Sequence, residues 1–163
     1  MRESIYTIPL NDVFGEQDGC PICRMRKMLE GRCIEYIMGA AMMEPDVRVE
    51  TNRWGFCGEH LSAMLKQKNR LSLALMLETH LDELLSGYMP PSGKKGQESP
   101  AHTCFVCREI DTAVQKLLEN TARTAVKDPD FAALLAEQPY YCFTHYEALC
   151  DTFRAVLPKK AAA

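Results

Sequence analysis

The sequence lacks the features that define several large protein classes. Its longest mostly apolar stretch, residues 71–77, is far shorter than the roughly 20 residues that a membrane-spanning helix needs. No apolar core of signal-peptide length occurs near Met1, so we expect no secretory signal. Only nine glycines and nine prolines occur among the 163 residues, too few for a low-complexity chain. We therefore expect a globular protein of the cytoplasm that does not associate with a membrane.

Neither sign of charge is in large excess. The formal net charge is −3, and charged residues make up 25% of the chain. This balance gives no bulk attraction to nucleic acid or to an anionic membrane. The fixed spacing of a nucleic-acid-binding zinc finger, with its short loop, is also missing. Nucleic acid is therefore not an expected partner.

Cysteine, in contrast, is abundant, with eight residues. This number is typical of a disulfide framework, a metal site or a redox centre. In the cytoplasm, metal ligands or reduced thiols are favoured over structural disulfides. A thioredoxin-like role for Cys20 and Cys23 would require a βαβ pattern around them, which the sequence does not contain.

Six of the eight cysteines belong to a pattern that occurs twice. In the first copy, Cys20-Pro21-Ile22-Cys23 is followed further along the chain by Cys57-Gly58-Glu59-His60. In the second copy, Cys104-Phe105-Val106-Cys107 is followed at almost the same interval by Cys142-Phe143-Thr144-His145. Matching positions keep a nearly constant offset between the copies, which indicates a duplicated module. Cys33 and Cys150 fall outside the pattern, and we expect both to be core residues.

The duplication predicts two halves joined by a linker. Residues 90–101 are rich in proline, glycine, serine and lysine, as linkers are. We place the first half at residues 1–89, with an additional helix at about 70–88, and the second half at residues 102–163.

Apolar residues recur at steps of three and four in both halves, the spacing of helices. The best strand-like alternation is at residues 47–52, where valines alternate with charged residues. We therefore predict an all-α bundle of two metal-stapled modules, with one short extended segment near 47–52.

Three thiolates and one imidazole are a standard tetrahedral ligand set for structural zinc. A CxxC pair lets two sulfurs converge on one ion, and a CxxH pair on a helix places its ligands at i and i+3 on one face. We predict one Cys₃His site within each copy, and thus two zinc ions. An iron–sulfur cluster remains an alternative cofactor. The predicted ligands are Cys20, Cys23, Cys57 and His60 in the first copy, and Cys104, Cys107, Cys142 and His145 in the second.

This pairing constrains the residues between the two motifs. A straight helix over residues 23–41 would carry the chain about 27 Å away from the CxxC. A wholly helical return over residues 42–56 would cover only about 22 Å. We therefore expect a short helix with loop or extended residues in this region, or a bend near Gly31.

Polar and aromatic residues gather ahead of Cys57, and the matching stretch of the second copy lacks them. With two residues of the following helix, they could line a pocket for an anion or another small ligand. The alternative interpretation is a solvated return loop that caps a helix. The candidate pocket residues are Arg48, Glu50, Asn52, Arg53, Trp54, Arg70 and His80.

Several segments resemble a family of uncharacterised bacterial proteins with a domain of unknown function, found mainly in anaerobic Firmicutes. The resemblance rests on tandem CPxC and GFCxxH motifs and covers nearly the whole chain. It is carried by residues 5–9, 20–23, 48–60 and 69–81. The resemblance implies a cytoplasmic bacterial protein and no established activity.

Two closed four-ligand sites would leave no coordination position for activating water, so the ions would contribute folding energy instead. We therefore favour a binding or adaptor module over an enzyme, without excluding an activity. The partner would be a protein or a small molecule. The alternatives are an enzyme or small-ligand-binding protein that uses the polar pocket, and an iron–sulfur electron carrier.

Overall fold

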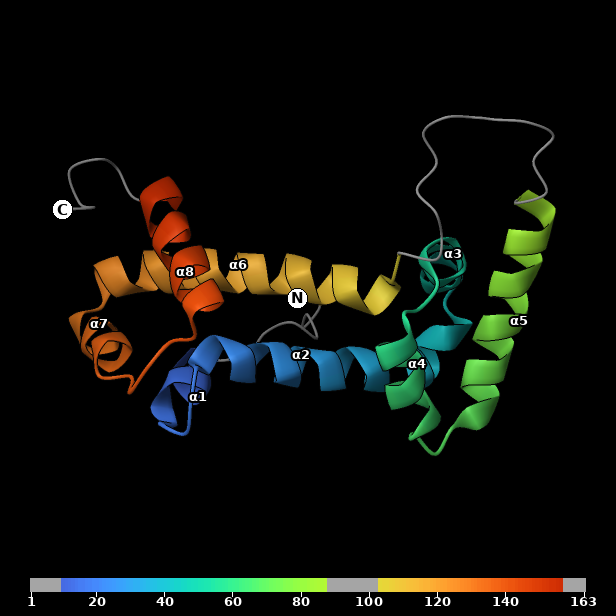
Figure 1. Cartoon of the computed structure of the whole chain (residues 1–163), viewed down its shortest axis with the longest axis horizontal. Helices are drawn as coiled ribbons and strands as arrows, with labels where there is room; N and C mark the ends of the chain where they lie inside the picture. Colours follow the sequence, from blue (N-terminus) through green and yellow to red (C-terminus); the bar gives the residue numbers. More distant parts are fainter. Residues whose placement is uncertain (1–9, 88–102, 157–163) are drawn as a thin grey trace. The chain divides into compact units, whose positions relative to one another are not determined.

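The computed structural model describes residues 10–87 and 103–156 (Figure 1). Within these residues every regular element is a helix, so the all-α prediction is confirmed. None of the helices in these two stretches is long and apolar enough to cross a membrane. In chain order the elements are α1 (Leu10–Gly15), α2 (Pro21–Met38), a 3₁₀ helix η1 (Ala40–Met43), α3 (Pro45–Trp54), α4 (Gly58–Leu65), α5 (Arg70–Gly87), α6 (Phe105–Lys127), α7 (Pro129–Ala136) and α8 (Phe143–Val156).

The chain divides into two compact units. Unit 1 consists of residues 1–30 and 110–163, and unit 2 consists of residues 31–109. The boundary falls inside α2 and again inside α6, so each of these helices contributes to both units. The units therefore differ from the predicted halves, because the start of the chain groups with its C-terminal region. The predicted linker 90–101 lies outside the described residues.

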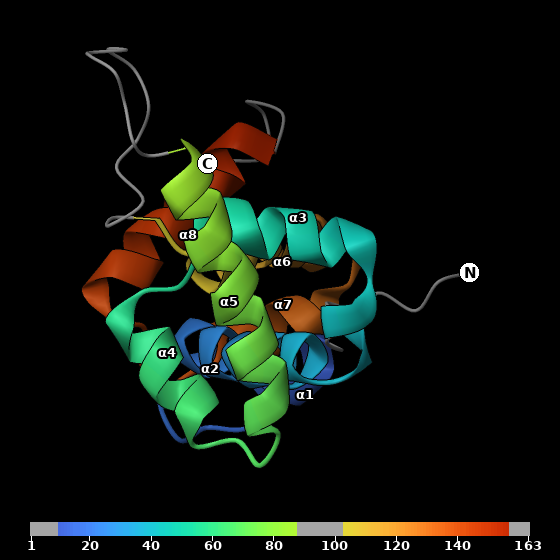
Figure 2. The same ribbon diagram turned by 90° about the vertical axis from the view of Figure 1, so that its right-hand side faces the viewer.

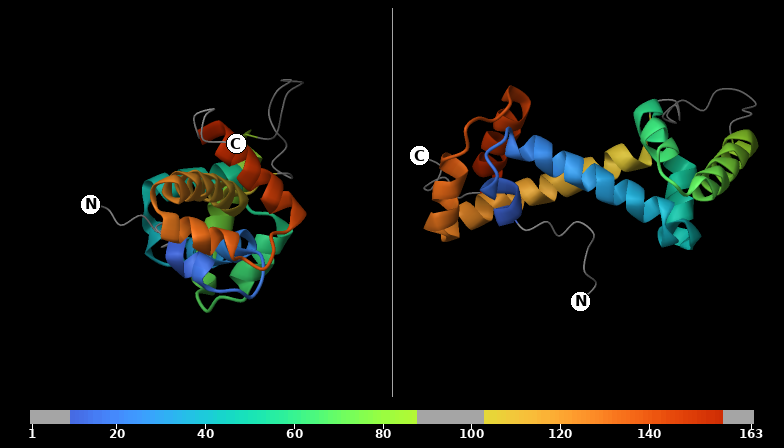
Figure 3. Two further views of the ribbon diagram at one scale, coloured as in Figure 1. Left: turned by 90° about the vertical axis from the view of Figure 1, so that its left-hand side faces the viewer. Right: turned by 90° about the horizontal axis from the view of Figure 1, so that it is seen from below.

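Unit 1 contains α1, α7 and α8, the first part of α2 and most of α6. Helix α7 lies against α1, as the left view of Figure 3 shows. The rings of Phe14 and Phe131 meet edge to face, with their centroids 5.5 Å apart. The side-chain amide of Gln138 donates a hydrogen bond of 2.6 Å to the carbonyl of Phe14. The Asp128 side chain caps α7 by accepting from the N–H groups of Asp130 and Phe131, so the helix has a defined start.

Unit 2 contains α3, α4 and α5 (Figure 2), with the end of α2 and the start of α6. Helix α5 occupies the position predicted for an additional helix at about 70–88 and packs against α3 and α4. Its buried face carries Leu73 and Met76, and α4 contributes the fully buried Met64. The start of α6 contributes Phe105 and Val106, which are also buried.

The predicted extended segment near 47–52 is wrong, because these residues lie within α3 (Pro45–Trp54). Pro45 occupies the first helical turn, where its fixed φ favours a helix. On a strand, Val49 and Thr51 would share one face. In the structure Val49 is 63% exposed and Thr51 is fully buried, so burial follows the helical period and not the alternation.

Candidate metal centres

All eight predicted metal ligands occupy equivalent positions at the starts of four helices. Cys20, Cys57, Cys104 and Cys142 directly precede α2, α4, α6 and α8. The second ligand of each motif lies three residues further on, in the first helical turn. The carbonyls of Cys57 and Cys142 each accept the first hydrogen bond of their helix, at 2.9 Å. Unpaired N–H groups and the positive end of the helix dipole therefore surround the sulfurs, which favours thiolates.

The structure groups these ligands differently from the sequence prediction. Site 1, in unit 1, consists of Cys20, Cys23, Cys142 and His145. Site 2, in unit 2, consists of Cys57, His60, Cys104 and Cys107. In each site the four ligand atoms lie within 4.8 Å of one another. Each site thus combines the CxxC of one copy with the CxxH of the other.

The pairing within each copy was therefore wrong, although the same eight residues form the two clusters. Helix α2 continues through Gly31 for 18 residues in all, Pro21–Met38. It begins in unit 1 and ends in unit 2, where the CxxH of the first copy also lies. The chain therefore never has to return to Cys20, because α8 supplies the remaining ligands of site 1.

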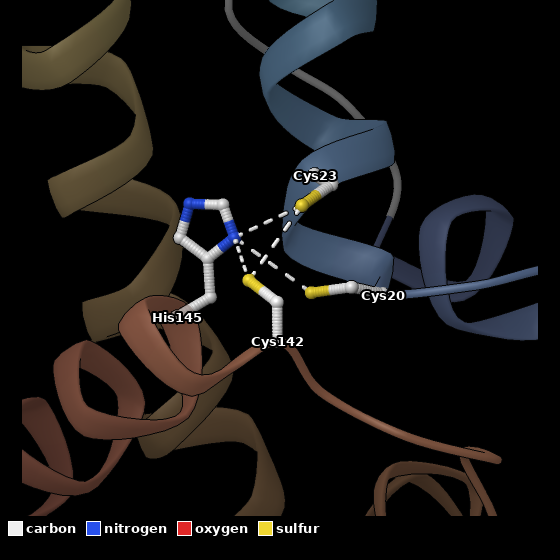
Figure 4. A group of neighbouring side chains, drawn as sticks. All are labelled: Cys20, Cys23, Cys142 and His145. Carbon is white, nitrogen blue, oxygen red and sulfur yellow. Dashed lines mark hydrogen bonds between the residues drawn. The ribbon is translucent and has the colours of Figure 1, made fainter.

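Figure 4 shows the side chains of site 1 pointing toward one another from α2 and from α8. The Nδ1 atom of His145 lies 3.7 Å from the sulfur of Cys20 and 3.3 Å from that of Cys23. It lies 3.1 Å from the sulfur of Cys142. The sulfurs of Cys23 and Cys142 are 3.7 Å apart. One imidazole nitrogen thus faces all three sulfurs.

Site 2 has the same geometry. The Nδ1 atom of His60 lies 3.1 Å from the sulfur of Cys57 and 3.3 Å from that of Cys104. It lies 3.4 Å from the sulfur of Cys107. The sulfurs of Cys57 and Cys107 are 3.9 Å apart. His60 and Cys104 are buried, and the other two ligands are half-buried.

These distances fit the edges of a tetrahedron around one metal ion. With metal–sulfur bonds of about 2.3 Å and metal–nitrogen bonds of about 2.0–2.1 Å, sulfur–sulfur edges measure about 3.8 Å and sulfur–nitrogen edges about 3.5 Å. A disulfide would instead require sulfurs about 2.05 Å apart. All eight cysteines are free thiols in the structure, so both sites have the donors and the spacing of a metal site.

The crowding of thiols in each site perturbs their ionisation. Burial, followed by hydrogen bonding and repulsion from neighbouring thiols, raises the pKa of Cys23 to about 12. Burial and the neighbouring Cys104 and Cys57 likewise raise the pKa of Cys107 to about 12. Burial also disfavours the Cys20 thiolate, but N–H groups that donate to its sulfur outweigh burial and lower its pKa. A divalent cation would offset the repulsion between the thiolates, so metal binding and deprotonation are coupled.

Burial, with the positive charge of Arg26 nearby, lowers the pKa of His145. The imidazole is therefore neutral at pH 7, which is the form that binds a metal ion.

The residues of the predicted polar pocket form two groups in unit 2. In the first, the guanidinium of Arg48 donates to the carbonyl of Leu75 at 2.8 Å and to the hydroxyl of Thr79 at 2.6 Å. The Thr79 hydroxyl donates to the side-chain oxygen of Asn52 at 2.7 Å. Nδ1 of His80 donates to the backbone carbonyl of Asn52 at 2.6 Å. These bonds give Arg48, Asn52 and His80 a role in joining α3 to α5.

The second group surrounds Trp54. Its indole N–H donates to Glu50 at 2.8 Å. The guanidinium of Arg53 lies 4.9 Å from the centre of the Trp54 ring, and that of Arg108 lies 4.1 Å away. The remaining pocket residue, Arg70, is exposed at the start of α5. The ligand pocket therefore stays a prediction.

A family of unknown function, DUF6062, matches residues 1–163. The chain belongs to this family. Among curated proteins and solved structures, none matches the DUF6062 chain. The predicted resemblance is thus confirmed as membership of a family without known function, and a bacterial origin stays a prediction.

Sequence reasoning missed three residues that support site 2 of this DUF6062 protein. Gly55 has a φ of +58°, and a Cβ atom on it would lie 2.5 Å from Nε2 of His80. Thr103 donates from its hydroxyl to the carbonyl of Trp54 at 2.8 Å. Arg108 packs on the Trp54 ring. Glycine ahead of a CxxH was a usable signal for Gly55, whereas the other two contacts depend on α6 meeting the end of α3.

Proposed function

We propose that the protein is a zinc-stabilised helical scaffold with two structural Cys₃His sites and a binding role. The observation that carries this proposal is the geometry of the two ligand sets. In each, three sulfurs and one Nδ1 atom lie within 4.8 Å of one another, as around a single tetrahedral ion. Four protein donors fill the coordination of such an ion, so no position is left for substrate or for activated water.

Zinc fits these sites better than an iron–sulfur cluster does. A cluster places several iron atoms and inorganic sulfides among its ligands. Sulfur–sulfur distances of 3.7 Å and 3.9 Å leave room for one ion only. A mixed set of three thiolates and one imidazole is typical of structural zinc. A reducing compartment such as the bacterial cytoplasm, which we propose as the location, would keep the thiols available for the metal.

The ions would act by joining helices that are distant in the sequence. Cys20 and His145 are 125 residues apart in the chain, and His60 and Cys104 are 44 apart. An ion bound by such residues contributes its binding free energy to folding. The chemistry of the sites therefore supports a structural role for the metals.

A binding role is supported by the exposed side of α5. Leu71, Leu81 and Leu85 are 65%, 54% and 70% exposed, and they lie on one side of the helix. Exposed apolar side chains that gather on one surface mark a contact site for another molecule. Glu78 and Asp82 are exposed on the same helix. The matching partner would be an apolar helix or peptide that carries lysine or arginine.

This surface can be tested without the partner. The substitution Leu81→Glu is expected to change the free energy of unfolding by no more than about 0.5 kcal/mol, because the side chain faces solvent. A loss of several kcal/mol would assign Leu81 to the protein's own packing and contradict the contact surface.

Metal analysis of the purified protein tests the central proposal. We expect two zinc ions per chain and no visible absorbance. Removal of the metal with a strong chelator should lower both the helical signal in circular dichroism and the cooperativity of melting. Iron with sulfide, or melting that is unchanged after complete metal removal, would overturn the proposal.

Two single substitutions supply a matched comparison. Cys57→Ser is expected to reduce the content to one zinc ion per chain, because it removes a sulfur from site 2. Cys150→Ser is the control, since this thiol lies outside both sites and should leave two ions bound. Equal zinc contents in the two variants would show that site 2 does not use Cys57.

A further inference from the structure

The two sites share a ligand set but differ in how far the ligands are exposed. In site 1, Cys23 is exposed, and Cys142 and His145 are half-buried. In site 2, none of the four ligands is exposed, and His60 and Cys104 are only 6% and 8% accessible. A thiolate from solution can therefore approach site 1 most readily at the exposed Cys23. In site 2 the most accessible ligands, Cys57 and Cys107, are half-buried, so the approach is more restricted.

The two sites also differ in the hydrogen bonds that join their ligand-bearing loops without a metal. In site 2, the N–H of Phe105 donates to the carbonyl of Gly55 at 2.9 Å. The hydroxyl of Thr103 donates to the adjacent carbonyl of Trp54 at 2.8 Å. Both bonds join the residues around Cys104 to the loop that leads into Cys57. They hold the two halves of site 2 together whether or not an ion is bound.

Neither bond can be reproduced in site 1. When the two CxxC motifs are aligned, Pro21 stands in place of Phe105 and Gly19 in place of Thr103. Proline has no N–H group to donate, and glycine has no hydroxyl. The two ligand loops of site 1 are joined by the N–H of Cys142, which donates to the Cys20 sulfur, but this link involves a metal ligand itself, so these loops depend more heavily on the ion.

Loss of the ion from site 1 would leave most of the packing of unit 1 intact. The contact of Phe14 with Phe131 and the bond from Gln138 to the carbonyl of Phe14 join α1 to α7 without using a metal ligand. The ion links the start of α2 to the start of α8. Its release would free this junction while the rest of the unit keeps its packing.

We infer that site 1 holds an exchangeable soft divalent ion and that site 2 holds a permanent one. The inference rests on the proposed function, because both sites must first bind zinc. In the exchange step, a sulfur of a thiolate-bearing acceptor forms a bond to the ion as the bond to the Cys23 sulfur breaks. The remaining bonds break in turn, the ion leaves with the acceptor, and the freed thiolates take up protons from solvent. No electron is transferred.

The test follows zinc transfer from the two-zinc protein to excess dimercaptopropanol, a small dithiol. Zinc lost from the protein is measured at intervals after rapid gel filtration. We expect two phases of one ion each, with rates that differ by about five- to a hundredfold, since each of the two missing hydrogen bonds is worth about two- to tenfold. The fluorescence of Trp54, the single tryptophan, shows which phase belongs to site 2. The carbonyl and ring of Trp54 contact Thr103 and Arg108 beside that site. The Trp54 fluorescence should change in the slow phase alone.

Variants make the assignment independent of fluorescence. Cys23→Ser should leave one ion, released in the slow phase. Thr103→Val should accelerate the slow phase about three- to tenfold and leave the fast phase unchanged. Thr152→Val is the matched control, because within the described residues its hydroxyl bonds to the carbonyl of Ala148 in its own helix, and it should leave both phases unchanged.

The outcomes separate this inference from the proposed function. A protein that binds fewer than two ions contradicts the proposed function. Two bound ions that leave in one phase, or a fast phase that changes the Trp54 fluorescence, overturn the exchangeable site 1 and leave the structural role of the metals in place. If Thr103→Val does not accelerate the slow phase, the hydrogen bond from Thr103 to Trp54 does not explain why site 2 retains its ion.

Discussion

The substitution Gly55→Ala should destabilise unit 2 strongly although it adds only one methyl group. Gly55 ends α3 two residues before Cys57, with φ of 58° and ψ of −154°. This conformation is almost restricted to glycine, so alanine costs about 1–3 kcal/mol in backbone strain. The added Cβ atom would also lie 2.5 Å from Nε2 and 2.6 Å from Cε1 of His80.

The imidazole has little freedom to move away. His80 is only 9% exposed, and its Nδ1 atom donates to the carbonyl of Asn52 at 2.6 Å. Moving the ring sacrifices this hydrogen bond, which is worth about 0.5–1.5 kcal/mol. The total loss is therefore about 1.5–4.5 kcal/mol. At about 2–4 °C per kcal/mol for a chain of this size, the melting temperature should fall by roughly 3–18 °C.

Urea titration of the zinc-loaded protein, followed by Trp54 fluorescence, measures this loss in unit 2. Gly31→Ala is the matched control, because Gly31 lies inside α2 and a Cβ atom there meets nothing within 4 Å. It should stabilise the protein by about 0.5–1 kcal/mol, since alanine favours the helix. In a His80→Ala background, Gly55→Ala should cost only the backbone strain.

Two results would refute this reasoning. A Gly55→Ala protein within about 0.5 kcal/mol of the parent would contradict both parts of the argument. If Gly55→Ala lowers the free energy of unfolding equally in the parent and in the His80→Ala background, backbone strain explains the whole loss. The contact with the imidazole would then contribute nothing.

Three further predictions concern ionisation and helix capping. Zinc binding to both sites at pH 7 should release at least two protons per chain, because the pKa values of Cys23 and Cys107 are about 12 without the ion. Calorimetry of zinc binding in two buffers with different ionisation enthalpies measures the number of protons released. A titration without proton release would contradict the assignment of these thiols as ligands. Burial raises the pKa of Cys33 from 9.0 to about 12, so its neutral form contributes stability that is complete below pH 9 and is lost as pH rises toward 12. The parent should therefore lose about 1.4 kcal/mol per pH unit in this range relative to Cys33→Val, whereas parallel pH profiles would exclude the effect. Asp128→Ala should cost about 1 kcal/mol through loss of the α7 cap and Asp128→Asn much less; an equal loss in denaturant titrations of both variants would contradict the capping role.

The ligand residues could be predicted from the sequence because their spacing is local. CxxC and CxxH each place two donors within one helical turn, and that geometry does not depend on the rest of the fold. The grouping of the four pairs could not be predicted in the same way. It depends on whether the chain returns after α2, and nothing local to Cys23 or Cys57 specifies this. A chain that leaves Cys23 along a helix returns to it with difficulty within residues 24–56. This difficulty was itself a sign that the CxxC of one copy shares a site with the CxxH of the other.

The polar residues ahead of Cys57 illustrate a different limit. Their types, among them Arg48 and His80, suit a ligand pocket and a helix interface equally well. The choice depends on the partners that α5 provides, such as the carbonyl of Leu75 and the hydroxyl of Thr79. The sequence predicted a short helix with loop or extended residues over 42–56, and the full extent of the helix over residues 45–54 was not predicted because valine alternation outweighed Pro45, a start signal in the sequence.

The crossed arrangement of the CxxC and CxxH pairs resembles that of two subunits that exchange ligand pairs. One copy of the motif alone carries a CxxC that belongs to one ion and a CxxH that belongs to the other. It could complete no site by itself, whereas two identical copies could complete two equivalent sites by exchanging pairs, as in a two-fold symmetric dimer. Within one chain the two sites can differ, as they do at the matching positions Pro21 and Phe105. Cutting the peptide between the copies should accordingly leave two fragments that associate less tightly once zinc is removed, although the contact of Phe14 with Phe131 and the bond from Thr103 to Trp54 still join them.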